Sequence, residues 1–236
     1  KIINTKTFVE DPLRILRAMQ FCARFNLEAD DELIKTASKM CKDKLLDELS
    51  KERIYEEFKK LFLKAEKISV GLEFLKKVDG FLYFSELQKI EKIWTKTLRY
   101  IDNVNRDVLD NNTNITVMLA ILSYEMDQNS CDRFLNKITS KKSILRSVSH
   151  LHHINRFLDK QTDRINYQIV KDIDTRSLEV YLDAKEFSQS VLKKVNQIKP
   201  KVQGRDLLDI GMERSKDFKG LLQLIFEIQI DNLFDK

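Results

Sequence analysis

Glycine and proline are scarce in this sequence. Its 236 residues include five glycines and two prolines, where average usage predicts about 16 and 12. Hairpins, glycine-rich phosphate loops and proline-rich linkers depend on these residues, so the sequence has little material for any of them. Charged residues instead alternate with Leu, Ile and Phe at spacings of three and four, as in helices that pack together. We therefore predict an all-α fold.

Cysteine and long apolar runs are also rare. The three cysteines, Cys22, Cys41 and Cys131, are odd in number and widely spaced, which suits a reducing compartment better than a disulfide framework or a CxxC metal site. No run approaches the roughly 20 apolar residues of a membrane span, and residues 1–7 lack a signal-peptide core. We expect buried thiols and a soluble, cytoplasmic protein with no membrane partner.

The net charge is small. The 42 Lys and Arg residues against 37 Asp and Glu residues leave a formal charge of +5, and both signs are mixed along the chain. This excess is a weak indication of a polyanionic partner.

Start and stop signals predict a series of helices. Asp11 precedes Pro12, which suits the first position of a helix, and Asn26 tolerates the left-handed conformation that follows a helix end. Further helices are expected over 31–41, 51–64, 70–78 and 205–210, and an amphipathic helix should run to Phe234. The apolar run 115–126 predicts a buried central helix, with polar interruptions at 110–114 and 160–166 and a boundary at 199–201.

The segment Glu10-Asp11-Pro12-Leu13-Arg14 places a carboxylate and a guanidinium three residues apart at a helix start. Such a pair presents an acceptor beside several donors. It matches the amino group, ring nitrogen and carbonyl of cytosine, and also the amino group and adjacent ring nitrogen of adenine. On spacing alone the alternative stays open that Asp11 is only a helix cap and Arg14 its ion partner.

The run from Phe8 to Phe25 resembles the EDxxR neck motif and following helix of class II CCA-adding enzymes and bacterial poly(A) polymerases. The resemblance implies that Asp11 and Arg14 form the amino-acid template that reads incoming CTP and ATP. It also implies that Glu10 helps to hold this template and that Arg17 belongs to the nucleotide-binding set. Gln20 and Asn26 depart from the family, which usually has Arg and Gly there.

The resemblance extends to both ends of the chain. Residues 34–61 are similar to the second neck segment of the family, residues 70–75 to the start of its body, and residues 204–211 to the G-[RK]-D-L motif of its tail. It therefore implies the helical neck, body and tail architecture of this family, with the neck at 1–66, the body at 67–198 and the tail at 199–236.

The tail also carries candidate RNA contacts. Lys199, Lys201 and Arg205 are basic residues that can meet the phosphate backbone of a tRNA. A solvated charged face explains them equally well, and both interpretations stay open.

No catalytic residue is expected within this chain. In the family, the chemistry and two Mg²⁺ ions belong to an N-terminal head with a DxD pair. The DxD here, Asp172-Ile173-Asp174, has no Gly-Gly turn or strand pattern around it, and Asp174 is expected to cap a helix beginning at Thr175. His150, His152 and His153 lack further ligands, so we expect a partly exposed histidine cluster and no metal site.

The resemblance thus implies the helical part of an RNA nucleotidyltransferase that adds CCA, or part of it, to tRNA 3′ ends. It implies that the neck selects the incoming base and that the body and the tail bind tRNA, with ATP and CTP as substrates and Mg²⁺ in the head. Addition of CC alone, of A alone or of poly(A) stays open, as does a helical RNA-binding module that has no enzymatic role.

Overall fold

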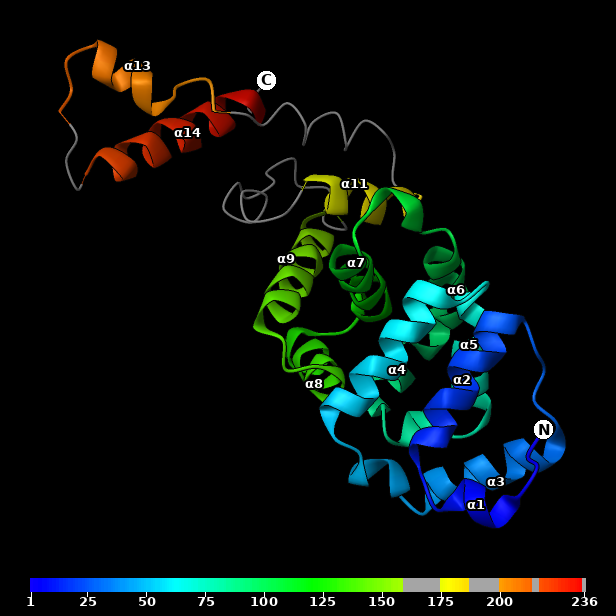
Figure 1. Cartoon of the computed structure of the whole chain (residues 1–236). Coiled ribbons are helices and arrows are strands. Elements are labelled where there is room, and N and C mark those ends of the chain that lie inside the picture. Colours follow the sequence, from blue (N-terminus) through cyan, green and yellow to red (C-terminus); the bar gives the residue numbers. More distant parts are fainter. Residues whose placement is uncertain (159–174, 187–199, 214–216, 235–236) are drawn as a thin grey trace.

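A computed structural model describes residues 1–158, 175–186, 200–213 and 217–234 of the chain (Figure 1). Every regular element in these ranges is helical, which confirms the all-α prediction. The α-helices and the 3₁₀ helices, labelled η, have these bounds: α1 Thr5–Val9, α2 Leu13–Phe25, α3 Asp31–Lys42, η1 Leu45–Glu48, α4 Lys51–Lys64, α5 Ile68–Lys77, η2 Gly80–Leu82, η3 Ser85–Ile93, α6 Trp94–Asp102, η4 Arg106–Val108, α7 Asn111–Ser123, α8 Gln128–Ile138, α9 Lys142–Leu158, α11 Thr175–Ala184, α13 Gly204–Asp209 and α14 Phe218–Phe234.

Helix α2 packs between α4 and α5, and the closest approach is at Gly71 of α5. A Cβ atom there would lie 2.7 Å from the carbonyl oxygen of Met19 and 2.9 Å from Cβ of Ala23. The backbones of α2 and α5 therefore meet directly. One apolar core continues from the predicted neck into the predicted body.

Polar contacts tie the same joint together. Arg106 donates 2.7 Å to the carbonyl of Ala65, the residue that ends α4, where a cation also suits the negative end of the helix. Asp102 accepts from the N–H of Ser69 in the first turn of α5 at 3.0 Å. Each helix end at the boundary thus has a partner from farther along the chain.

Helix α7 forms the centre of the predicted body. All its residues from Asn114 to Ser123 are buried, and α4, α6, α8, α9 and α11 pack around it. The prediction of a buried central helix is confirmed. The prediction of an interruption at 110–114 was wrong, because Asp110 caps the helix and Asn114 donates to the carbonyl of Leu109. These polar residues begin the helix instead of separating two.

Most other helix boundaries match the sequence signals. Ser50 caps α4, which has the predicted bounds, and Asn26 ends α2 in the left-handed conformation at φ 48°. Helix α1 was not predicted, since five residues carry too little periodic signal. Residues 160–166 and Asp172-Ile173-Asp174 lie outside the described residues.

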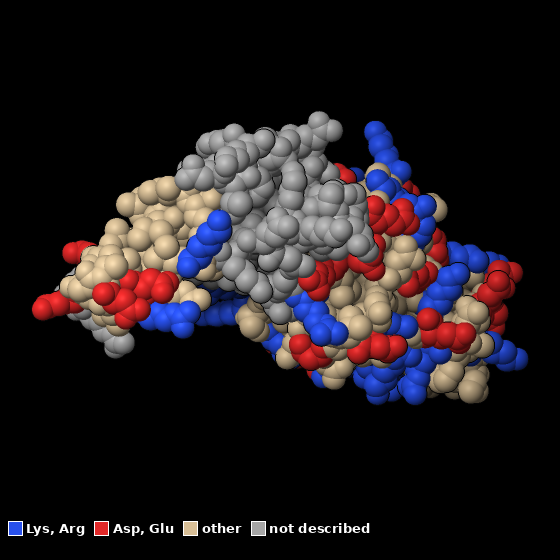
Figure 2. All heavy atoms as spheres, turned by 90° about the horizontal axis from the view of Figure 1, so that it is seen from above, with Lys and Arg blue, Asp and Glu red and all other residues tan. Residues whose placement is uncertain are grey.

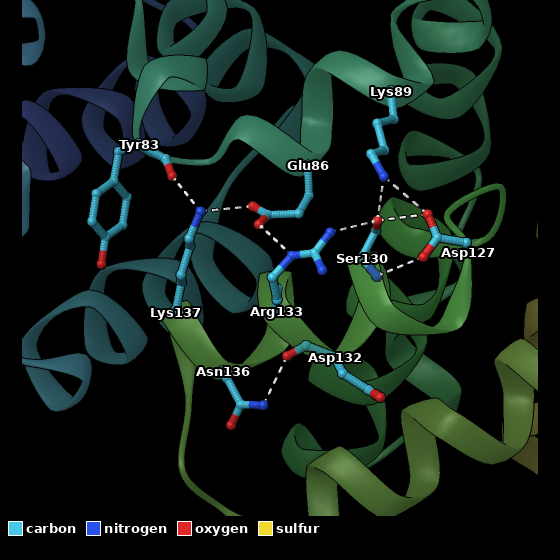
Figure 3. A network of polar contacts seen from close by, with 9 residues as sticks. All are labelled: Tyr83, Glu86, Lys89, Asp127, Ser130, Asp132, Arg133, Asn136 and Lys137. Atoms are coloured by element: carbon cyan, nitrogen blue, oxygen red, sulfur yellow. Dashed lines mark hydrogen bonds and ion pairs between the residues drawn. The ribbon is translucent and has the colours of Figure 1, made fainter.

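A buried carboxylate joins η3 to α8 (Figure 3). Glu86 is 4% exposed, and it pairs with Lys137 at 2.8 Å and with Arg133 at 3.7 Å. Lys137 also donates to the carbonyl of Tyr83. Two cations and their hydrogen bonds offset the desolvation of one buried charge, so Arg133 and Lys137 serve the packing of the body.

The segment that leads into α13, and the first residue of α13, contact α14. The Lys201 N–H donates 2.8 Å to Gln229, and Gly204 lies beside the ring of Phe218. The prediction of an amphipathic α14 was wrong for its described side chains, because Phe226 is buried while Leu224 and Ile228 are each 52% exposed. Figure 2 shows an uncharged area on this end of the molecule with acidic and basic residues along its border, and both charge signs are mixed over the other described part of the visible face.

The cysteines and one histidine are interior residues. All three thiols are buried, as predicted, and burial with the nearby Asp79 raises the pKa of Cys41 to about 12. His152 is fully buried and its Nε2 lies 2.8 Å from the Met126 carbonyl, so a partly exposed cluster was the wrong interpretation for it. His150 is half-buried, and the side chain of His153 lies outside the described part.

Within the described ranges, no helix combines the length and the apolar composition that crossing a membrane requires.

Candidate nucleotide-binding site

The start of α2 positions the residues singled out by the sequence. Oδ1 of Asp11 accepts from the N–H of Leu13 at 3.2 Å, which turns the chain into the helix as predicted. Pro12 is the cap residue and the helix begins at Leu13, one residue later than the sequence predicted. Arg14 then lies within the first turn of α2, one helical turn beyond Asp11.

Asp11 is held by an arginine from a different helix. Nη2 of Arg53, in the first turn of α4, lies 2.9 Å from the same Oδ1, and the Asp11 side chain is 28% exposed. The second oxygen, Oδ2, has no contact among the described residues. One oxygen therefore fixes the carboxylate, and the other stays available as an acceptor.

Arg14 does not pair with Asp11. Its Nη1 donates to the carbonyl oxygen of Thr7 in α1, so the ion pair considered as the alternative from spacing is not what the structure has. The remaining guanidinium N–H groups of this half-buried side chain stay available as donors. An acceptor from Asp11 and donors from Arg14 are thus presented from adjacent turns at one end of α2.

A cavity of about 580 Å³ opens beside this end of α2. Arg14 and Arg17 line it, and Phe8, Ala18 and Phe21 form part of its apolar wall. Phe21 is 42% exposed, and aromatic rings of this kind provide flat surfaces for stacking. The cavity combines cations with an apolar wall, the properties that suit a nucleotide with its phosphates and its base.

The other predicted residues differ in how far the structure supports them. Glu10 is exposed and its carboxylate makes no contact with the described residues, so its role in holding the template stays a prediction. Lys201 and Arg205 are exposed near α13, where Arg205 lies 3.7 Å from Asp206. Lys199 lies outside the described part.

Sequence reasoning did not identify Arg53 as the partner of Asp11. It also did not identify Phe8 and Phe21 as part of the cavity wall. The residue pair 11 and 53 is separated by 42 positions, and no local spacing rule connects them. An available signal was the position of Arg53 in the first turn of a capped helix, where a cation is unfavourable for the helix dipole. A cation in this position indicates an anionic partner in another part of the chain.

The described residues contain no group of three or more His, Cys, Asp and Glu side chains that could hold a metal ion.

Several known proteins are similar to this chain in sequence. No family profile matches the chain. A stretch of 82 residues is 40% identical to the CCA-adding enzyme of Lactococcus lactis, covering 34% of this chain and 20% of that protein. The A-adding tRNA nucleotidyltransferase of Halalkalibacterium halodurans is 26% identical over 95% of this chain and 53% of its own length. The multifunctional CCA protein of Neisseria meningitidis is 43% identical over 53 residues, which are 22% of this chain and 13% of that protein.

Solved structures share the fold. A CCA-adding enzyme with ATP superimposes with a TM-score of 0.66 at 17% identity, over 98% of this chain and 59% of that one. A Thermotoga maritima CCA-adding enzyme in a complex with tRNA gives 0.65 at 16% identity, over 100% of this chain and 60% of that one. The chain therefore spans about 60% of these structures or less, and only part of each sequence relative. It is related in sequence to tRNA nucleotidyltransferases and has the fold of the helical region of CCA-adding enzymes.

Proposed function

We propose that this chain is the helical part of an RNA nucleotidyltransferase that extends tRNA 3′ ends, and that the start of α2 selects the incoming nucleotide. The observation that carries the proposal is the presentation of Asp11 and Arg14. Arg53 holds one oxygen of Asp11 at 2.9 Å and leaves the other available, and Arg14, three residues further on, lines the cavity, although Asp11 is not itself a lining residue. The relatives named as CCA-adding and A-adding enzymes support it.

In this proposal the two residues read one edge of the base. Oδ2 of Asp11 accepts from the exocyclic amino group that cytosine and adenine share, and the guanidinium of Arg14 donates to the adjacent ring nitrogen. Uracil and guanine carry a carbonyl oxygen where cytosine and adenine carry that amino group, so each would face Oδ2 with an acceptor. Leaving such polar groups unpaired costs about 1–3 kcal/mol, which accounts for selection of CTP and ATP as substrates.

Arg17 and the cavity complete the proposed site. Arg17 is exposed at the cavity mouth, one turn after Arg14, where a cation meets a triphosphate. Magnesium would accompany the transfer chemistry. Because the described residues offer no ligand group for it, the ion is not assigned to this chain, and base reading by Asp11 and Arg14 does not require it.

The proposal is tested by fusing the N-terminal part of the Lactococcus lactis CCA-adding enzyme to this chain. That relative is chosen because it is 40% identical to this chain over 82 residues. The fusion protein should incorporate CTP or ATP into a tRNA that lacks its 3′ end, and the length of the product would distinguish CCA, A and poly(A) addition. A folded fusion that binds tRNA without adding nucleotides would favour the RNA-binding module instead.

A further inference from the structure

The longest stretch without an acidic residue runs from Arg133 to Leu158. It contains six Lys and Arg residues and neither Asp nor Glu, while the whole chain has 37 acids in 236 residues. The charges of this stretch are therefore not mixed in the way they are elsewhere. Such a run either neutralises carboxylates of the fold or faces an external anion.

The first two cations of the stretch are used inside the fold. Arg133 and Lys137 both pair with the buried Glu86 (Figure 3). The next two, Lys141 and Lys142, have no ion pair with a described carboxylate. Lys141 lies over the ring of Tyr55, and Lys142 has no contact with any described residue. Neutralising the carboxylates of the fold therefore does not account for Lys141 and Lys142.

The fully exposed residues at the beginning of α9 carry only cations and hydroxyl groups. Between Thr139 and Ser149 the apolar side chains of Ile144 and Val148 are buried, and Leu145 is half-buried against the core. The exposed residues of this segment, which we call the α9 strip, are Ser140, Lys141, Lys142, Ser143, Arg146 and Ser147. Protein interfaces are enriched in aromatic residues and Met, and the strip has none, whereas Lys, Arg, Ser and helix N-termini are the usual contacts of nucleic-acid phosphates.

The place of the lysines in the helix points the same way. Lys142 is the first residue of α9 and Lys141 precedes it, at the end where the helix dipole is positive. Cations there cost roughly 0.3–1 kcal/mol, so helix stability does not account for them. A bound phosphate would be attracted by the lysines and by the free N–H groups of the first turn together.

The strip begins close to the proposed nucleotide site. Nζ of Lys141 lies 4.2 Å from the ring centroid of Tyr55 in α4. Tyr55 is two residues after Arg53, which holds Asp11. An RNA strand whose 3′ end lies next to a nucleotide bound at Asp11 and Arg14 would therefore have its backbone within reach of the strip.

We propose that the α9 strip binds backbone phosphates of the RNA substrate. The proposal rests on the proposed function, since that function requires an RNA 3′ end near Asp11. It places a phosphate contact in the body of the chain, separate from Lys199, Lys201 and Arg205 of the tail.

The test measures binding of the complete chain to a tRNA without its CCA end at several salt concentrations. Lys142→Gln changes a side chain without described contacts, and the double variant Lys141→Gln with Lys142→Gln removes two cations of the strip. One phosphate contact contributes about 0.8 to the slope of log K against log salt, or about sixfold in affinity at 0.1 M. We expect about a sixfold loss for the single variant and up to about fortyfold for the double variant.

The matched control is Lys35→Gln with Lys39→Gln, two exposed lysines one turn apart on α3, which should leave the slope unchanged. Thermal midpoints show that all variants are folded. A double variant that keeps the wild-type affinity and slope would overturn the proposal that the α9 strip binds phosphates. The incorporation assay of the fusion protein still tests the proposed function separately. If poly-glutamate binds as tightly as tRNA and the variants lose affinity for both equally, RNA is not the specific ligand and the proposal is overturned. If the chain does not bind tRNA even at low salt, both proposals are overturned.

Discussion

Arg53 of α4 lies 2.9 Å from Oδ1 of Asp11, the carboxylate that begins α2. Asp11 lies just before α2, and α2 and α4 share the core of the predicted neck. The orientation of Asp11 is therefore set by the packing of α4 against α2, and it does not depend on Arg14. This relationship leads to two predictions about base selection and separates them from predictions about stability.

Asp11→Ala and Arg14→Ala in the fusion protein should each reduce discrimination against UTP and GTP. A lost charge-assisted hydrogen bond costs about 1.5–3 kcal/mol, which corresponds to about ten- to a hundredfold in selection. The ratio of kcat/KM values for CTP or ATP over UTP or GTP measures this, with the thermal midpoint recorded beside it. Arg24→Ala, an exposed arginine of the same helix, is the control. Mutants that lose stability but keep their selectivity would show that Asp11 is only a cap.

Arg53→Ala should reduce the same selectivity through Asp11. The ion pair is partly exposed, with Arg53 48% exposed, so its loss should change the free energy of unfolding by about 1 kcal/mol or less. Arg53→Lys keeps the charge without the planar fork and should restore selectivity in part. If Arg53→Ala leaves the selectivity ratio unchanged, Asp11 is positioned by its own helix turn alone.

Gly71→Ala should destabilise the joint between α2 and α5. The added Cβ would meet the Met19 carbonyl at 2.7 Å and Leu61 Cδ1 at 2.8 Å, so the helices must move apart at a cost of about 1–3 kcal/mol. Denaturant unfolding measures this loss. Gly220→Ala in α14 has no neighbour within 4 Å and should be neutral or stabilising by up to about 1 kcal/mol. Equal effects of the two substitutions would contradict the close approach.

Asp110 should make the stability of α7 depend on pH. Hydrogen bonds from the hydroxyl and the N–H of Thr113, and from Asn112, lower its pKa. A lowered pKa contributes stability above the unfolded value of about 3.9, and this contribution is lost as the pH falls through the folded pKa. Asp110→Ala should cost about 0.5–2 kcal/mol at pH 7, and the difference should shrink below pH 4.

The control for this pH effect is Asp107→Asn, which changes an exposed carboxylate three residues earlier. Urea unfolding of both variants between pH 3 and pH 7 gives the comparison. A cost of Asp110→Ala that stays constant over this range would show that the charge of Asp110 does not stabilise the cap.

Much of the fold follows from local signals. Ser50 and Asp30 cap α4 and α3, and Asn26 takes the left-handed conformation that ends α2, because these side chains satisfy or permit the backbone geometry of helix ends. The apolar run that became α7 has one stable solution, which is burial at the centre. The EDxxR segment likewise predicted an acceptor and donors at a helix start.

The sequence by itself determined most of the helices and where the candidate template lies along the chain, since capping and periodicity act over a few neighbouring residues. Only the tertiary structure decided the partner of Asp11, the donation from Arg14 to Thr7 and the burial of His152. Each of these depends on how helices pack, and packing brings together groups whose separation along the chain follows no period. The charged residues can be read from the sequence. Only the fold shows which of them form ion pairs and which described lysines do not.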